Sequence, residues 1–298
     1  MLSKALGRAC IFVGLVAGGA LGGVGECHAL PEGIVEPLIT PYQPNYFLPL
    51  VWGRPYEDPW VKYQFSIRTP LFPEKLSARV GLRPEFVFTH RAFWRLYRGE
   101  SAPIDEHDLS PGALVEVTAL AFSGRYGEPV HVFFGVVHQS TGEAGEKSRG
   151  WNQFFVELAG NGEKTLDRFR LRLWGAFGVE QTRVKDGVVA QRGNPDIGEH
   201  LGLVVIGGRP FGASLLWDVQ LPSNALTGSL VAGEGPSRIV LEMGWPYVSG
   251  SFLIPFDQEG NTALIFAGHY GKYAGLRDYD QKRWQFGVGL AVSSFRRP

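Results

Sequence analysis

Short segments of alternating apolar and polar residues recur along the chain after residue 29. No later stretch is apolar for the roughly 20 residues that a membrane-spanning helix requires. The clearest segment is Arg168–Leu173, where arginine alternates with Phe or Leu, and the alternation returns at Trp284–Val292. Successive side chains of a β-strand point to opposite faces, so the pattern predicts strands with one apolar and one polar face.

The sequence predicts twelve strands, separated by residues rich in Gly, Pro, Asp and Asn: 44–53, 60–71, 82–97, 111–123, 129–140, 150–160, 165–180, 198–209, 212–222, 236–246, 261–271 and 283–295. An even number of strands of about 10 residues is typical of an all-β, transmembrane antiparallel β-barrel. A soluble β-sandwich or a lipocalin-like barrel would show the same alternation. The strand lengths, an export signal and arginines on one face favour the membrane barrel.

The predicted connections differ in length between the two ends of this barrel. With both termini in the periplasm, the outer connections are 98–110, 181–197, 223–235 and 272–282, and the short inner turns are 124–128, 161–164 and 210–211. Longer outer loops are typical of bacterial barrels. Two inner connections, 72–81 and 247–260, are longer than this rule predicts.

The first 29 residues have the features of a secretory signal peptide. Lys4 and Arg8 precede the apolar run Ala9–Val24, and Cys27–Ala29 provides small residues at a cleavage site. We therefore expect a signal peptide at 1–29 and a single outer-membrane barrel at 30–298. Both cysteines lie in the signal peptide, so the mature chain would be exported without disulfides, and a closed barrel is one way to stabilise such a chain.

The charge balance argues against nucleic acid as a partner. Lys plus Arg and Asp plus Glu both number 29, so the chain lacks the basic excess that phosphate backbones demand. Glycine is abundant, with 40 residues, and 13% of the chain is aromatic. This composition suits β structure with many turns.

Three residues near the predicted 129–140 and 150–160 hairpin could act together in catalysis. His138 and Ser140 are two apart, so they share a face of one strand, and Asn152 begins the next strand. A serine hydroxyl needs a base to become a nucleophile, and a histidine base needs a polar group to orient it. An isolated His-x-Ser is more often a pair of rim residues than a catalytic site. A catalytic role therefore depends on the residues around this triplet.

The wider pattern around this triplet resembles the outer-membrane phospholipase A family. The similarity is strongest over His138-x-Ser140-x-Gly142 followed by Ser148-Arg149-x-Trp151-Asn152. Weaker matches extend from about Thr40 to Phe295, at Pro41–Tyr46, Phe93–Leu96, Glu100–Pro103, Asn194–Ile197, Asp278–Tyr279 and Gly287–Gly289. The short motifs are common one by one, whereas their order and spacing are specific.

The resemblance implies a twelve-stranded barrel that hydrolyses sn-1 and/or sn-2 acyl esters of phospholipids. Ser140 would then be the nucleophile, His138 the general base and Asn152 the residue that orients the imidazole. Gly142 would donate a backbone N–H to the oxyanion hole, which stabilises the tetrahedral intermediate. The family acts as a homodimer in the outer membrane.

The resemblance also implies calcium as a cofactor. Ser148 matches a side-chain ligand, Glu143 the position of a backbone carbonyl ligand, and Ser101 a carbonyl ligand from the partner subunit. Glu143 departs from the arginine usual in the family, and a carboxylate there could strengthen calcium binding. The loop Trp94–Ser101 is one residue shorter than usual. The tail Phe295–Pro298 is atypical, because such barrels commonly end on an aromatic residue.

Strand parity predicts which way the candidate triad faces. His138 and Ser140 share the parity of the apolar residues on their own strand, Val132, Phe134 and Val136. Asn152 shares the parity of the apolar residues on the next strand, Phe154, Val156 and Leu158. Apolar faces of a membrane barrel face lipid. The triad is therefore expected on the outer wall, level with the esters of the outer leaflet.

Two other functions remain open from the sequence. The chain could be a non-catalytic barrel, either a structural protein or a small pore with Arg168, Arg170 and Arg172 along an anion path. It could also be a relative that lost activity or needs a different activator, given Glu143.

Overall fold

A computed structural model describes residues 39–53, 56–73, 77, 82–98, 102–119, 130–143, 149–162, 167–177, 180–185, 188–193, 204–206, 209–221, 237–244, 247–256, 262–272 and 282–292. The expected signal peptide, 1–29, lies outside these residues, as do Ser101 and Ser148. Across the described ranges, no helix is long and apolar enough to cross a membrane.

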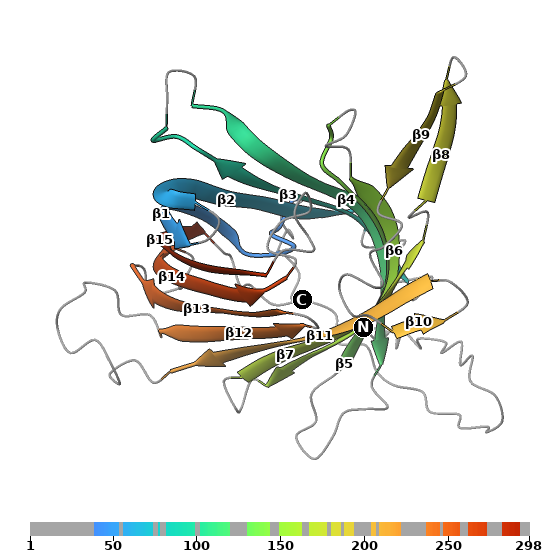
Figure 1. The fold of residues 1–298 in the computed structure, drawn as a ribbon. Coiled ribbons are helices and arrows are strands. Elements are labelled where there is room, and N and C mark those ends of the chain that lie inside the picture. The colour runs from blue at the N-terminus through green and yellow to red at the C-terminus, as the bar shows by residue number, and fades with distance from the viewer. Residues whose placement is uncertain are drawn as a thin grey trace, which may run out of the picture.

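Twelve strands form a closed antiparallel barrel (Figure 1). They are β1 (Asn45–Gly53), β2 (Tyr56–Pro70), β3 (Arg83–Trp94), β4 (Ile104–Ala119), β5 (Val130–Ser140), β6 (Gly150–Gly162), β7 (Asp167–Phe177), β11 (Arg209–Gln220), β12 (Arg238–Gly244), β13 (Tyr247–Pro255), β14 (Thr262–Gly271) and β15 (Arg283–Val292). Sequence neighbours pair around the ring, with β7 against β11 and β15 against β1. The hairpin of β8 (Glu180–Lys185) and β9 (Val188–Gly193) projects from the barrel, and β10 (Val204–Ile206) pairs with β11.

The predicted number of wall strands is confirmed, but one predicted strand is wrong. Because β7 pairs directly with β11, the segment 198–209 contributes no strand to the wall; its described part forms β10 and the first residue of β11. The missing wall strand is β13, which the sequence analysis assigned to the connection 247–260. Its centre, Ser249-Gly250-Ser251, has the composition of a turn, and these small residues interrupt the apolar face.

Because the wall lacks the predicted strand 198–209 and gains β13, β11 and β12 run in the opposite direction from the one predicted. Connections 95–103, 141–149, 178–208, 245–246 and 272–282 lie at the rim where β1 ends and β2 begins, and the others lie at the opposite rim. The connection 223–235 lies outside the described residues, but β11 ends and β12 begins at the rim opposite to the one predicted, so its prediction as an outer connection is wrong. The predicted inner turn at 210–211 lies inside β11 and is also wrong.

Strand β4 begins at Ile104, seven residues before its predicted start at 111. The triplet Ser110-Pro111-Gly112 has the composition of a turn, yet Pro111 lies within the strand opposite Phe88 of β3. On its other side, pairing with β5 is interrupted between Leu109 and Gly112. A proline has no N–H to donate to a ladder, which accounts for an interruption there.

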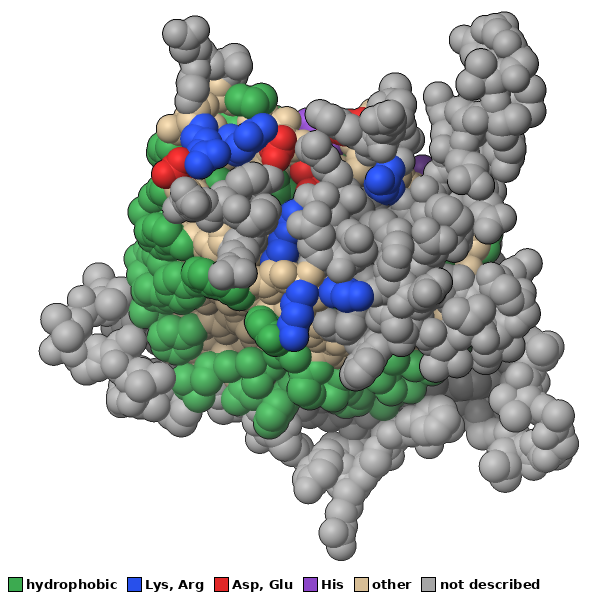
Figure 2. Space-filling model, in the orientation of Figure 1, with side chains coloured by type: hydrophobic (Ala, Val, Ile, Leu, Met, Phe, Trp, Pro, Cys, Tyr) green, Lys and Arg blue, Asp and Glu red, His purple; other side chains and the backbone are tan. Residues whose placement is uncertain are grey.

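The two faces of the wall differ as the alternation predicted. Large apolar side chains are exposed on its outer surface around the ring, including Phe47, Phe65, Phe86, Phe134, Phe154, Leu173, Trp217, Met243, Val248, Tyr270 and Trp284. Figure 2 shows part of this apolar surface in green, along one side and the lower edge of the barrel. A continuous apolar exterior with polar groups inside is the arrangement of a membrane-spanning barrel.

Charged groups in the interior pair with one another. Glu157 of β6 is buried and binds Arg170 (3.2 Å) and Arg172 (2.8 Å) of β7. The segment before β1 adds Tyr42, whose hydroxyl accepts a hydrogen bond from Arg172. On the next two strands of the wall, Arg238 of β12 pairs with Asp218 of β11.

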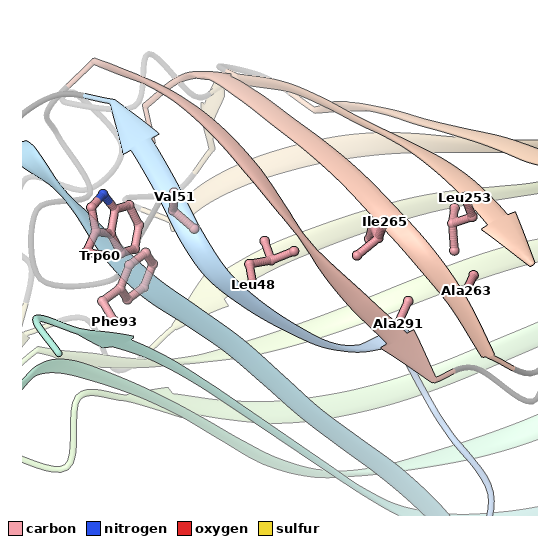
Figure 3. Close-up of a cluster of buried hydrophobic side chains, with 8 residues drawn as sticks. All are labelled: Leu48, Val51, Trp60, Phe93, Leu253, Ala263, Ile265 and Ala291. Carbon is pink, nitrogen blue, oxygen red and sulfur yellow. The ribbon is translucent and has the colours of Figure 1, made fainter. Parts of the chain in front are cut away.

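A cluster of buried apolar side chains packs inside the wall formed by the two ends of the chain (Figure 3). Trp60 of β2 stacks on Phe93 of β3 with their ring centroids 5.1 Å apart. Leu48 and Val51 of β1 continue the cluster toward the C-terminal strands, which contribute Leu253, Ala263, Ile265 and Ala291. The cluster thus packs across the seam between β1 and β15.

Gly289 of β15 lets the seam strands come close, and this yields a stability prediction. A Cβ at Gly289 would lie 2.0 Å from the backbone oxygen of Phe47, which cannot move without distorting β1. We expect Gly289→Ala to destabilise the barrel by about 1–3 kcal/mol through this overpacking. The measurement is the urea midpoint of the heat-modifiable band on gels. Gly268→Ala is the matched control, because its Cβ would meet nothing closer than 3.9 Å. Equal midpoints for both variants would contradict the prediction.

Candidate active site

The antiparallel pairing of β5 and β6 places Asn152 directly opposite His138. Nδ1 of His138 and Oδ1 of Asn152 lie 2.9 Å apart. An amide oxygen can only accept, so the Nδ1–H of His138 is the donor. In the neutral ring this leaves the Nε2 lone pair free to take a proton, which is the tautomer a general base requires.

Ser140 lies two residues beyond His138 on the same face, at the end of β5. The ladder places it opposite Gly150 on one side and Leu109 on the other. Two residues along a strand span about 7 Å between Cα atoms, within which the two side chains can lean toward each other. In the described residues, Ser140 makes no hydrogen bond to His138. The structure therefore brings the predicted triad to one face and joins two of its members directly.

The candidate triad lies on the outer wall of the barrel. Along β5, Phe134 and Val136 are 50% and 48% exposed, whereas Val137 is 8% exposed. His138 continues the exposed parity, and Asn152 shares the parity of Phe154 on β6. The predicted orientation toward the lipid-facing side is thus the one that the structure has.

An interior side chain that the sequence analysis missed anchors this end of β5. Gln139 lies between His138 and Ser140, points inward and is 4% exposed. Its amide nitrogen donates to both carboxylate oxygens of Asp108 on β4, at 3.1 and 2.9 Å. A fixed Gln139 restrains the backbone of both outward neighbours. Strand parity could have predicted the inward direction of Gln139, because a residue between two outward-facing positions of a strand must face inward.

The loop that follows Ser140 is closed by the buried Thr141. Its N–H donates to the Arg149 carbonyl at 3.0 Å, and its Oγ1 accepts from the Arg149 N–H at 3.1 Å. Gly142 then adopts φ +67°, in the left-handed region that favours glycine. The Gly142 N–H bonds to no other described residue.

Of the predicted calcium ligands, the structure describes only Glu143. Its Oε2 is buried and has no hydrogen-bond partner among the described residues. A buried carboxylate oxygen of this kind suits calcium, which prefers oxygen ligands. Ser101 and Ser148 lie outside the described residues, and in the rest of the described chain no three His, Cys, Asp or Glu side chains gather around a common point.

Comparison with known proteins identifies the family. The family model described as Phospholipase A1 matches residues 35–292, which is most of the chain. The chain belongs to the phospholipase A1 family. This family model spans all the wall strands, including the hairpin that carries His138, Ser140 and Asn152.

A relative of this phospholipase A1 family chain occurs in Neisseria meningitidis serogroup B. That protein, named "Putative phospholipase A1", is 25% identical over 236 residues, which are 77% of this chain and 53% of the relative. The chain thus spans about half the length of this curated relative.

Solved structures share the fold of this family member. The outer membrane phospholipase of Salmonella typhi, a dimer with bound calcium, is 18% identical with a TM-score of 0.64, covering 90% of this chain and 96% of that one. Outer membrane phospholipase A of Escherichia coli is 18% identical with a TM-score of 0.63, covering 86% and 99%. An active-site mutant of the E. coli protein, with asparagine replaced by alanine, gives a TM-score of 0.61 at 17% identity, covering 90% and 95%. The chain shares the barrel fold of these outer-membrane proteins.

Proposed function

We propose that the chain is a calcium-dependent phospholipase that hydrolyses acyl esters of phospholipids on the outer wall of its barrel. The observation that carries this proposal is the hydrogen bond between His138 and Asn152 on a lipid-facing surface, with Ser140 on the same face. A histidine oriented in this way next to a serine is the constellation of acyl-transfer enzymes. The E. coli protein that shares this fold also has an asparagine in its active site, which agrees with the role proposed for Asn152.

In the proposed reaction, the Ser140 Oγ attacks the ester carbonyl carbon and its proton passes to Nε2 of His138. The Gly142 N–H donates to the oxyanion that forms. When the ester C–O bond breaks, the leaving glycerol oxygen takes the proton from His138. Water then attacks the acyl-serine while His138 takes its proton. The bond between the acyl carbon and the Ser140 Oγ breaks, the Oγ recovers that proton from His138, and the fatty acid leaves. Asn152 holds the imidazole throughout.

The location of the triad fits a lipid substrate. A phospholipid that left the bilayer would expose its acyl chains to water at a cost of about 0.8 kcal/mol per CH₂. A triad on the outer wall lets these chains stay in an apolar environment beside Phe134 and Val136. After removal of residues 1–29 on export, the triad would face the outer leaflet.

Calcium and a second copy of the chain would complete the site. Glu143 would offer its backbone carbonyl and, beside it, its buried carboxylate. Ser148 of the same chain and a carbonyl of Ser101 from a second copy would join it. Bound there, calcium would add positive charge beside the developing oxyanion. A shared ion couples calcium binding to dimerisation, so calcium would favour the dimer and the dimer would favour calcium binding.

The pore alternative receives no support from the lumen. Arg170 and Arg172, which would line an anion path, both bind the buried carboxylate of Glu157. Arg172 also donates to Tyr42, which lies in the segment before β1. An anion would have to displace these partners, so the interior arginines are better explained as members of a hydrogen-bonded polar network.

The test is release of fatty acid from a short-chain phospholipid in detergent by the purified barrel, with calcium and then with chelator. We expect turnover with calcium, near-complete loss with chelator, and more crosslinked dimer when calcium is present. Absence of turnover in every condition would contradict the proposed function. Equal dimer and full activity in chelator would contradict the calcium dependence.

A single substitution tests the proposed role of Glu143. Glu143→Gln removes one negative charge from the site, so we expect the calcium concentration for half-maximal activity to rise about tenfold, because ligand charge sets calcium affinity. The control is Asp58→Asn, which removes a charge that pairs with Arg98 at the same rim. Identical calcium dependence of Glu143→Gln and the wild type would exclude this carboxylate as a ligand.

A further inference from the structure

Two histidines form a pair on the outer wall beside the candidate triad. Nε2 of His90 on β3 lies 3.0 Å from Nδ1 of His107 on β4, and the two rings stack with centroids 5.2 Å apart. Both residues have outward parity, because Thr89 and Asp108 beside them are buried in the interior. The ring of Tyr63 on β2 meets His90 edge-on at 5.4 Å.

Ionisable side chains are costly on a lipid-facing surface and generally indicate function. The mutual hydrogen bond uses one nitrogen of each ring, and the other two, His90 Nδ1 and His107 Nε2, have no hydrogen-bond partner among the described residues. In either neutral tautomer, one of these two nitrogens is a donor. With one added proton both are donors and the pair is cationic, which suits an anionic oxygen ligand.

The strand register aligns this pair with Ser140. Ser140 lies opposite Leu109 on β4, and Leu109 lies opposite His90 on β3. His90 is therefore two strand spacings from Ser140, which is about 10 Å between Cα atoms. His107 lies two residues closer than Leu109 to the rim with the 141–149 loop, which is the outer rim in the proposed orientation. Lipid headgroups lie on that side of the ester.

The dimensions of a phospholipid match this spacing. Bonds of about 1.5 Å along the glycerol backbone place the ester carbon and the phosphorus about 6–8 Å apart in an extended lipid. The attacking Oγ adds about 3 Å before reaction. With the ester at Ser140, the phosphate can therefore reach the two histidines over the side chain of Leu109.

We propose that His90 and His107 form a binding subsite for the phosphodiester of the phospholipid whose ester is cleaved at Ser140. Tyr63 packs against His90 and holds its ring. This inference rests on the proposed function and specifies how the substrate is oriented. The subsite recognises the phosphate that all glycerophospholipids share, so it would select phospholipids over neutral acylglycerols without selecting a headgroup.

The test compares two substrates of equal acyl length, a short-chain phosphatidylcholine and the corresponding phosphate-free glycerol ester. His90→Phe and His107→Phe keep an aromatic ring on the lipid-facing surface, so the barrel should fold. We expect the KM for the phospholipid to rise about 10-fold or more, as for loss of a hydrogen bond to a charged group, with kcat little changed. The KM for the phosphate-free ester should stay as in the wild type, and His90→Gln should recover part of the loss.

Several outcomes would overturn the subsite. Unchanged KM for the phospholipid, or equal losses on both substrates together with loss of the crosslinked dimer, would mean that the histidines serve packing. Inhibition of ester hydrolysis by inorganic phosphate in the wild type but not in His107→Phe, with the KM for the phospholipid unchanged in that variant, would assign the pair to free phosphate. Tyr270→Phe, on the outer face of β14, is the control for a changed lipid-facing ring. A wild type that cleaves neither substrate would refute the proposed function itself.

Discussion

Replacing Ser140 with alanine is expected to reduce phospholipid hydrolysis by several orders of magnitude and to leave the barrel folded. The side chain lies at the end of β5 on the outer wall, outside the buried clusters, so its removal costs little packing. Loss of the nucleophile in a triad removes most of the rate enhancement, and what remains comes from binding and the oxyanion hole. Fatty acid release and the heat-modifiable shift on gels measure the two effects separately.

The control for this variant is Ser251→Ala, which removes a hydroxyl from β13 on the inner face of the wall. It should retain wild-type turnover. Unchanged turnover in Ser140→Ala would exclude Ser140 as the nucleophile, whatever the other residues do.

Replacing His138 with alanine should be as damaging as replacing Ser140, and Asn152→Ala should be less damaging. His138 moves the proton, whereas Asn152 only holds the ring through the 2.9 Å bond to Nδ1. In a triad of this kind, loss of the orienting residue costs roughly 10–100-fold less than loss of the base. The comparison is kcat for the two variants on the same phospholipid.

Asn152→Asp is the matched control for the second comparison, because a carboxylate can also accept the Nδ1 proton. It should be more active than Asn152→Ala. If Asn152→Ala were as inactive as His138→Ala, and Asn152→Asp gave no recovery, the role given to Asn152 would be wrong.

Much of the barrel could be predicted from strand parity, because one-sided burial imposes an alternation that can be read directly. Leu173, exposed on the lipid side, and Arg172, paired inside with Glu157, are neighbours on β7 with the predicted orientations. Strand β13 could not be found in this way. Ser249 bonds to Glu242 in the interior and Gly250 lies outside, so neither carries the apolar signal.

The candidate triad could be predicted because its members lie close in sequence. His138 and Ser140 share a strand, and a single hairpin connects them to Asn152, so local register determines their geometry. The partners of Gln139 and His90 could not be predicted in the same way. Asp108 and His107 belong to the part of β4 before the Ser110-Pro111-Gly112 triplet, which the sequence assigned to a loop. Because the start of β4 was predicted seven residues too late, neither the contact of Gln139 with Asp108 nor that of His90 with His107 could be predicted.

The central claim is that Ser140 on the outer wall is an activated nucleophile that takes an acyl group from a lipid. Its most direct test is to treat the barrel, in detergent with calcium, with a long-chain alkyl sulfonyl fluoride, and to locate the modification by peptide mass spectrometry. We predict one stable adduct on Ser140 that inactivates the enzyme and does not form in His138→Ala. Full inactivation with the adduct on another residue, or labelling of Ser140 that is equally fast in His138→Ala, would contradict the account.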